Sequence, residues 1–67
     1  MTQTEQILNH LKTGKAITPL GAIERFGVMR LAARVRDLRD MGIDVKRRMI
    51  PVINRYGKEV MVAEYRL

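Results

Sequence analysis

The residues of this sequence with the clearest potential for chemistry are four closely spaced arginines. They are Arg30, Arg34, Arg36 and Arg39, all within the stretch Thr18–Gly42. The guanidinium group is permanently charged, and its planar fork of N–H donors matches phosphate oxygens and the acceptor edge of guanine. Arginines at helical spacing therefore indicate a surface that binds a polyanion. The alternative is a solvated helix face that serves only solubility.

The positive charge is concentrated in the middle of the chain. Of the net charge of +6 on 67 residues, residues 25–48 contribute eight basic against three acidic side chains, or +5. Residues 1–24 are balanced, and residues 49–67 add +1. A protein surface that serves only solubility usually mixes positive and negative side chains more evenly. The asymmetry therefore favours a polyanion as the partner.

Two helices are predicted ahead of the arginines. Thr2 and Glu5 have capping-box spacing at the start of the first helix, and Gly14 suits its end. Thr18, followed by a proline, predicts the start of a second helix that ends near Arg25. The second helix must position the arginine-rich segment that follows it.

One side of the second helix is expected to be buried. Leu20, Ile23 and Phe26 have the spacing to face inward together, with Ala22 close by. Gly21 lies inside this helix, where glycine costs up to about 1 kcal/mol relative to alanine. We therefore expect close packing of Gly21 against a neighbouring backbone. Residues 15–17, just before this helix, form either a short strand or an extended linker.

A third helix is predicted from Val28 to Met41, between glycines that suit a turn and a helix end. Leu31, Val35 and Leu38 fall on one side of it and are expected to be buried, with Ala32 beside them. The residues expected to face outward are Met29, Arg30, Ala33, Arg36, Asp37 and Asp40.

Arg34 and Arg39 lie on the two shoulders of the third helix. For Arg34 two roles remain open. It either pairs with Glu24 or Asp37 and braces the helix, or it reaches a phosphate.

The last third of the chain has β periodicity. Ile43–Lys46 alternates, Arg47-Arg48 interrupts the pattern, and Met49–Ile53 is apolar. Asn54–Lys58 predicts a turn, and Glu59–Arg66 a returning strand. Three helices followed by a hairpin predict an α+β winged helix-turn-helix, in which residues 1–67 form a single domain and the hairpin is the wing.

The residues also resemble a known family. The segments I-T-P-x-x-A-x-x-x-F-G, R-L-A-A-R-V-x-x-L-R and G-I-x-V, with a hairpin ending in AEYRL, look like the small winged helix-turn-helix proteins of bacteriophages and prophages. The resemblance covers nearly the whole chain. It implies binding of double-stranded DNA in phage regulation or recombination. It also implies a cytoplasmic setting in a bacterial or phage-infected cell.

The candidate DNA contacts come from the third helix, the hairpin and the start of the second helix. Arg30 and Arg36 are expected to read guanine, and Ala33 to allow close approach to a thymine methyl. The hairpin is expected to contact the flanking backbone or minor groove. The full set is Thr18, Met29, Arg30, Ala33, Arg34, Arg36, Asp37, Arg47, Arg48, Arg55 and Lys58.

Catalysis and cofactor binding are not expected from this composition. The chain has one histidine, no cysteine and no phosphate-cradling glycine loop. No apolar run approaches the roughly 20 residues that span a bilayer, and the N-terminus lacks the pattern of a signal peptide. We therefore expect no enzyme, no cofactor or metal, and no membrane partner.

Several alternatives remain open at the level of sequence. A winged helix can serve protein–protein contact, although such domains usually lose the basic outward face. RNA is a further alternative, and the scarcity of exposed aromatic residues argues against single-stranded RNA, whose bases stack on aromatic side chains. A transcriptional regulator and an excisionase-like architectural recombination factor are not separated. A chain this short covers few base pairs, so a homodimer or a cooperative array is expected, through Met49–Ile53 or Val60–Leu67.

Overall fold

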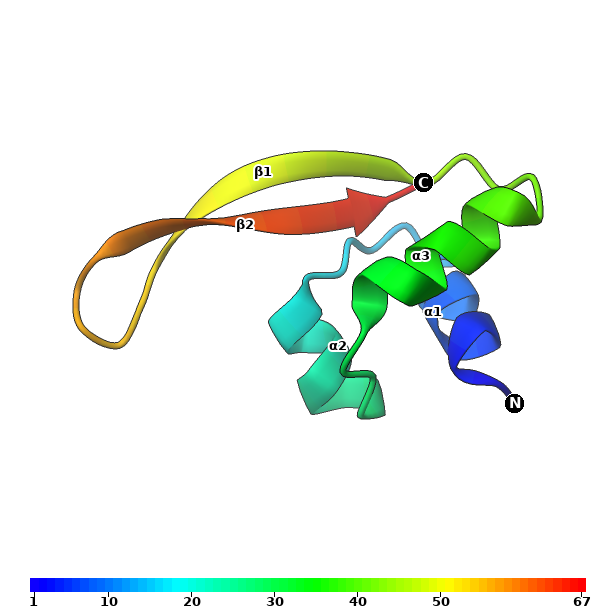
Figure 1. Cartoon of the computed structure of the whole chain (residues 1–67), viewed down its shortest axis with the longest axis horizontal. Coiled ribbons are helices and arrows are strands. Elements are labelled where there is room, and N and C mark those ends of the chain that lie inside the picture. Colours follow the sequence, from blue (N-terminus) through cyan, green and yellow to red (C-terminus); the bar gives the residue numbers. More distant parts are fainter.

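Three helices pack beneath one end of a long hairpin in the computed structural model, which describes residues 1–67 (Figure 1). The hairpin is a two-stranded antiparallel sheet, and its turn projects well beyond the helices. This arrangement confirms the predicted winged helix-turn-helix architecture. The elements are α1 (Gln3–Lys12), α2 (Pro19–Phe26), α3 (Leu31–Asp40), β1 (Lys46–Ile53) and β2 (Glu59–Arg66).

The predicted helix caps are present. The Thr2 hydroxyl accepts from the Glu5 backbone N–H at 3.1 Å, while the Glu5 carboxylate accepts from the Thr2 N–H at 3.3 Å. The Thr18 hydroxyl caps α2 with a single bond, which it accepts from the Gly21 N–H at 3.1 Å. Gly27 ends α2 with φ of 67°, a left-handed conformation that suits glycine. Local hydrogen bonding thus fixes where α1 and α2 begin.

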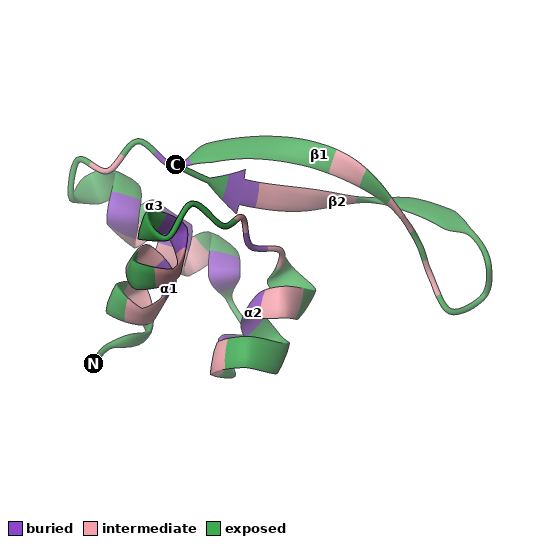
Figure 2. Cartoon of the chain, turned by 180° about the vertical axis from the view of Figure 1, so that it is seen from behind, coloured by how far each residue is buried: buried purple, intermediate pink, exposed green.

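The core is built on the apolar side of α3. Leu31, Val35 and Leu38 are all buried, as predicted, and they join Ile7 and Leu11 of α1 in one cluster. The burial is concentrated among the helices and at the adjoining end of the hairpin, whereas the rest of the hairpin is largely exposed (Figure 2). The hydrophobic effect therefore fixes the rotation of α3 about its own axis.

The prediction for α2 was wrong in part. Leu20 and Ile23 are 64% and 45% exposed, and the residue that α2 buries is Ala22. The helix has only eight residues, and small Ala22 lets it approach the core closely. Phe26 is half-buried and packs against the core. The close neighbour of Gly21 is the capping hydroxyl of Thr18, 3.3 Å from where a Cβ would stand, and not a backbone.

The start of α3 also differs from the prediction. The helix begins at Leu31 and not at Val28, and it ends at Asp40 and not at Met41. Val28 is buried in the connection, where its N–H donates to the Ala22 carbonyl at 3.1 Å. The buried Val28 thus holds an irregular turn at the position where the first turn of the helix was predicted. Arg30 consequently occupies the N-cap position of α3 and not its exposed side.

The strands of the hairpin pair without interruption. The register runs from Lys46 opposite Arg66 to Ile53 opposite Glu59. The predicted break at Arg47-Arg48 was wrong, because β1 starts at Lys46 and runs through both arginines, whereas residues 43–45 form a loop. Two consecutive charged residues are compatible with a strand whose two sides both reach solvent.

The segment between α1 and α2 contributes a bridge to the sheet. Ile17 and Tyr65 exchange two backbone hydrogen bonds of 2.9 and 2.8 Å, and both residues are buried. Of the two readings of residues 15–17, the structure thus supports the strand-like one. The bridge also occupies the outer edge of β2 at Tyr65, which leaves that part of Val60–Leu67 unavailable for pairing with another chain.

Burial predicts which leucine sets the stability of the fold. We expect Leu38→Ala to lower the free energy of unfolding by about 2–5 kcal/mol, because it opens a cavity in the core. The matched change Leu20→Ala should cost less than about 1 kcal/mol, since this side chain is mostly solvated. Urea unfolding followed by circular dichroism measures both values. Equal losses in the two variants would contradict this assignment of the core.

Candidate nucleic-acid interface

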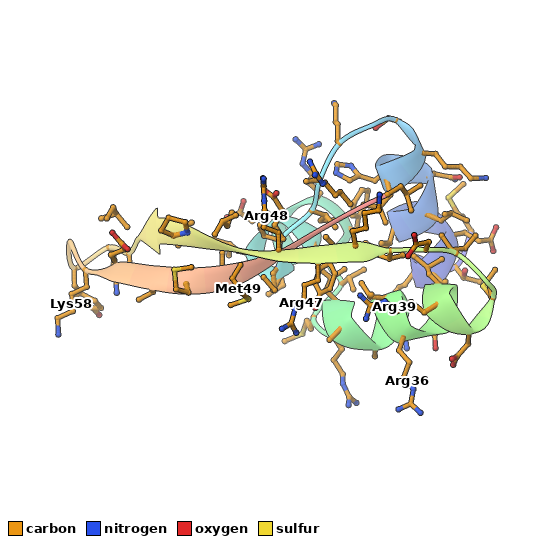
Figure 3. The ribbon with its side chains drawn as sticks, turned by 90° about the horizontal axis from the view of Figure 1, so that it is seen from above. Arg36, Arg39, Arg47, Arg48, Met49 and Lys58 are labelled. Atoms are coloured by element: carbon orange, nitrogen blue, oxygen red, sulfur yellow. The ribbon has the colours of Figure 1, made fainter.

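One side of the molecule carries basic residues from both α3 and the hairpin. Arg36 projects from α3 away from the body, and Arg47 projects from β1 toward the same side (Figure 3). Lys58, at the tip of the hairpin, also points to this side (Figure 3). We call Arg36, Arg47 and Lys58 the basic face. All three are exposed, and none forms an ion pair or a side-chain hydrogen bond within the chain.

Arg30 and Met29 lie in the turn that precedes α3. Both side chains are exposed, and Arg30 forms no side-chain hydrogen bond. The Arg30 carbonyl accepts from the N–H groups of Ala33 and Arg34 at 3.1 and 3.3 Å, which starts the helix. The Arg30 side chain thus remains available to a ligand. It would contact that ligand from the N-terminal end of α3 and not from the exposed side of the helix.

The outward side of α3 is rotated slightly from the predicted one. Ala32, Arg36 and Asp40 are exposed, whereas Ala33 and Asp37 are half-buried. The reason is that α1 covers the side of α3 that carries Asp37. The sequence could not indicate this cover, because helical periodicity gives the apolar side but not which neighbour overlaps its margins.

Arg34 and Asp37 form a contact with the start of α1. The Arg34 Nε lies 3.1 Å from Asp37 Oδ2, and its Nη1 donates to the Gln3 side chain at 3.4 Å. The Thr4 hydroxyl donates to the same Asp37 oxygen at 3.3 Å. These side chains lie along the junction between α1 and α3, which matches the bracing alternative for Arg34, with Asp37 as its partner.

Arg47 and Arg48 point to opposite sides of the hairpin. Successive side chains alternate along a strand, and Figure 3 shows Arg48 directed away from the side of Arg47. The Arg48 guanidinium is paired with Glu64 on the neighbouring strand at 2.9 Å. A single flat ligand surface therefore meets only one of these two arginines.

The remaining predicted residues lie at the start of α2 and at the hairpin turn. Thr18 is half-buried, and its hydroxyl is engaged in the cap of α2. Arg55 and Lys58 are exposed. The turn between them is held by the Asn54 side chain, which accepts from the N–H groups of Tyr56 and Lys58 at 2.9 and 3.0 Å. The turn thus presents two cations on a defined backbone.

Sequence reasoning missed a contact made by Arg39. Its Nε and Nη2 both donate to the backbone carbonyl of Val45, at 3.2 and 2.9 Å. The two residues are six apart across a loop, a spacing that no sequence motif marks. Arg39 therefore links the last turn of α3 to the residue just before β1.

No group of three His, Asp or Glu side chains is placed to hold a metal ion. His10 Nε2 lies 2.9 Å from the Ala16 carbonyl, and its ring packs edge-on against Phe26, which accounts for it structurally. None of the helices has the length and apolar composition needed to cross a bilayer.

Comparison with known families agrees with the geometry. A family model described as a winged helix-turn-helix domain matches residues 2–67. No curated protein and no solved structure matches the chain significantly. The family model therefore covers the whole fold, from the first helix to the end of the wing.

The contact between Arg34 and Asp37 predicts a measurable coupling in stability. Arg34→Ala and Asp37→Ala should each lower the free energy of unfolding slightly, and the double variant should lose less than their sum. We expect a coupling of about 0.2–1 kcal/mol, because the pair is partly solvated. Thermal unfolding of the four proteins measures it. Arg36→Ala, which removes an unpaired charge, is the control. A loss with Arg36→Ala as large as with Arg34→Ala would contradict the bracing role.

Proposed function

The chain belongs to the winged helix-turn-helix domain family, and from this premise we propose that it binds double-stranded DNA with a sequence preference. In this proposal α3 lies in the major groove and the wing contacts the flanking backbone or minor groove. One observation carries it: Arg36 on α3 and Arg47 on the wing project to the same side without partners in the chain. A helix fits the major groove, and arginine is the residue best suited to read guanine there.

We assign base reading to the exposed part of α3 and the turn before it. Arg36 is the first candidate for a bidentate contact with guanine, worth about 1–3 kcal/mol of discrimination. Arg30, at the N-cap, is the second. Ala32 is exposed and Ala33 half-buried, and these small side chains allow α3 to approach a thymine methyl closely.

Phosphate contacts are assigned to the wing and to the start of α2. Arg47, Arg55 and Lys58 supply positive charge along the hairpin, and such contacts fix orientation more than sequence. Thr18 marks the N-terminal end of α2, where the helix dipole favours a phosphate. Arg34, Asp37 and Arg48 are assigned structural roles, because each is engaged within the chain.

The biological setting is proposed from the sequence resemblance. We infer a transcriptional regulator of a phage or prophage, acting in the cytoplasm of its host. An excisionase-like recombination factor is the alternative, and a DNA-bending assay distinguishes the two. Because a reader of this size covers few base pairs, we infer that several copies bind neighbouring sites as a dimer or array. Sedimentation with and without DNA tests this inference.

Electrostatic binding predicts a steep dependence on salt. If about four phosphates are neutralised, the logarithm of the binding constant should fall with the logarithm of salt concentration with a slope of about −4. Fluorescence anisotropy on a duplex obtained by selection from random sequence measures the slope. Binding that stays flat from low to moderate salt, or no binding to any selected duplex, would contradict the proposed function.

The two classes of arginine should respond differently to substitution. Arg36→Ala should weaken binding to the selected duplex by about 10-fold or more and relax the preference at one base position. Competition with duplexes mutated at each position reveals this effect. An equal loss on all sequences would make Arg36 a phosphate contact and not a base reader.

Arg47 and Arg48 form a matched pair, because each substitution removes one positive charge from adjacent positions of β1. Arg47→Ala should lower the affinity about threefold to fivefold, as expected for one solvent-exposed ionic contact. Arg48→Ala should have a smaller effect, since this side chain points away and pairs with Glu64. Equal losses in the two variants would show that net charge, and not the orientation of the face, determines binding.

A further inference from the structure

The root of the wing is held to the helices by apolar packing and by two sets of hydrogen bonds. Val45 and Tyr65 belong to the buried core, and Ala63 packs against it. On the side of β2, Ile17 and Tyr65 exchange two backbone hydrogen bonds. On the side of β1, the Arg39 guanidinium donates twice to the carbonyl of Val45, which is itself buried. No backbone N–H donates to this carbonyl. Arg39 is therefore its only partner in the chain.

The length of the wing makes the contact at its root important. β1 has eight residues, and at about 3.3 Å per residue it extends about 26 Å from Lys46. A change of about 10° in the direction of such a strand displaces its far end by about 4–5 Å. An ion pair requires an N–O separation of no more than about 4 Å. A displacement of this size is therefore enough to break one. Small errors at the root thus remove Lys58 from a phosphate that it otherwise reaches.

The fork geometry explains why an arginine stands at this position. Two N–H groups of one planar guanidinium converge on the Val45 oxygen, so the direction of the side chain is fixed as well as its distance. A lysine carries the same charge on a flexible stem, without a planar pair of donors. The loop between the two residues turns at Gly42, whose φ is 88°, and its backbone bonds include Gly42 N–H to the Arg39 carbonyl and Ile43 N–H to the Leu38 carbonyl, both 3.0 Å. None of these bonds uses the Val45 carbonyl, from which β1 continues.

We propose that Arg39 is a positioning residue, whose guanidinium fixes the direction in which the wing leaves α3, so that Arg47 and Lys58 reach the same DNA duplex as Arg36. This inference rests on the proposed function. It separates Arg39 from the arginines that contact DNA, although all of them share one basic segment of the sequence. The competing role is a direct phosphate contact, for which only the charge matters.

Arg39→Lys distinguishes the two roles, because it keeps the charge and removes the fork. In the wild-type background, Arg47→Ala should lower DNA affinity about threefold to fivefold. In the Arg39→Lys background the same change should cost less than about twofold, because the wing no longer delivers Arg47 to the duplex. The matched control is Arg25→Lys, an exposed arginine of α2 that makes no ion pair or side-chain hydrogen bond. In the Arg25→Lys background, Arg47→Ala should still lower DNA affinity about threefold to fivefold.

A measurement on the free protein completes the test. Residual dipolar couplings of backbone amides should fit one common alignment for α3 and the hairpin in the wild type. In Arg39→Lys and Arg39→Gln, the helices should keep their mutual alignment while the hairpin departs from it. This readout requires no DNA and is not changed by a uniform loss of stability.

The outcomes separate the two proposals. If the wild type binds no duplex, the proposed function fails and Arg39 has no DNA-positioning role. If the wild type binds, but Arg39→Lys preserves both the full Arg47→Ala loss and the common alignment, the positioning role is overturned and the proposed function stands. A reduced Arg47→Ala loss together with a displaced hairpin supports the positioning role.

Discussion

The burial of one apolar stripe on α3 is the constraint on which the rest of the structure depends. Leu31, Val35 and Leu38 must leave water together, and this requirement fixes the rotation of the helix. Once they are buried, Arg36 is directed into solvent. The other elements cover the stripe or extend from it: α1 packs along α3, α2 approaches through Ala22, and the hairpin closes over one end. Burial on one side thus creates the basic surface on the other.

Much of the fold could be predicted from local signals in the sequence. The caps at Thr2 and Thr18 depend on hydrogen bonds within four residues, and they form as their spacing indicates. The buried stripe follows from the helical period, and the hairpin turn from Asn54 and Gly57, whose φ of 78° suits glycine. These features are local, so neighbouring residues suffice to specify them.

The features that could not be predicted depend on packing between distant segments. Leu20 has the spacing of a core residue, yet the short α2 meets the core through a smaller side chain and leaves Leu20 in solvent. Arg47 and Arg48 look equivalent in the sequence, and only a strand that runs through both separates them onto opposite sides. The fork of Arg39 reaches a carbonyl across a loop, which no pattern of residue types encodes. The candidate site was therefore predictable as a set of arginines, but not in its division into exposed and engaged members.

The most direct test of this account maps the DNA-binding surface on the protein itself. Amide and side-chain NMR signals are recorded on the isotope-labelled chain while a selected duplex is added. The account predicts the largest changes at Arg30 and Arg36 and along Arg47 and the hairpin turn, with small changes at Arg34 and Arg48. Changes centred on Arg34, Arg48 and the exposed side of α1, with the basic face unaffected, would contradict it.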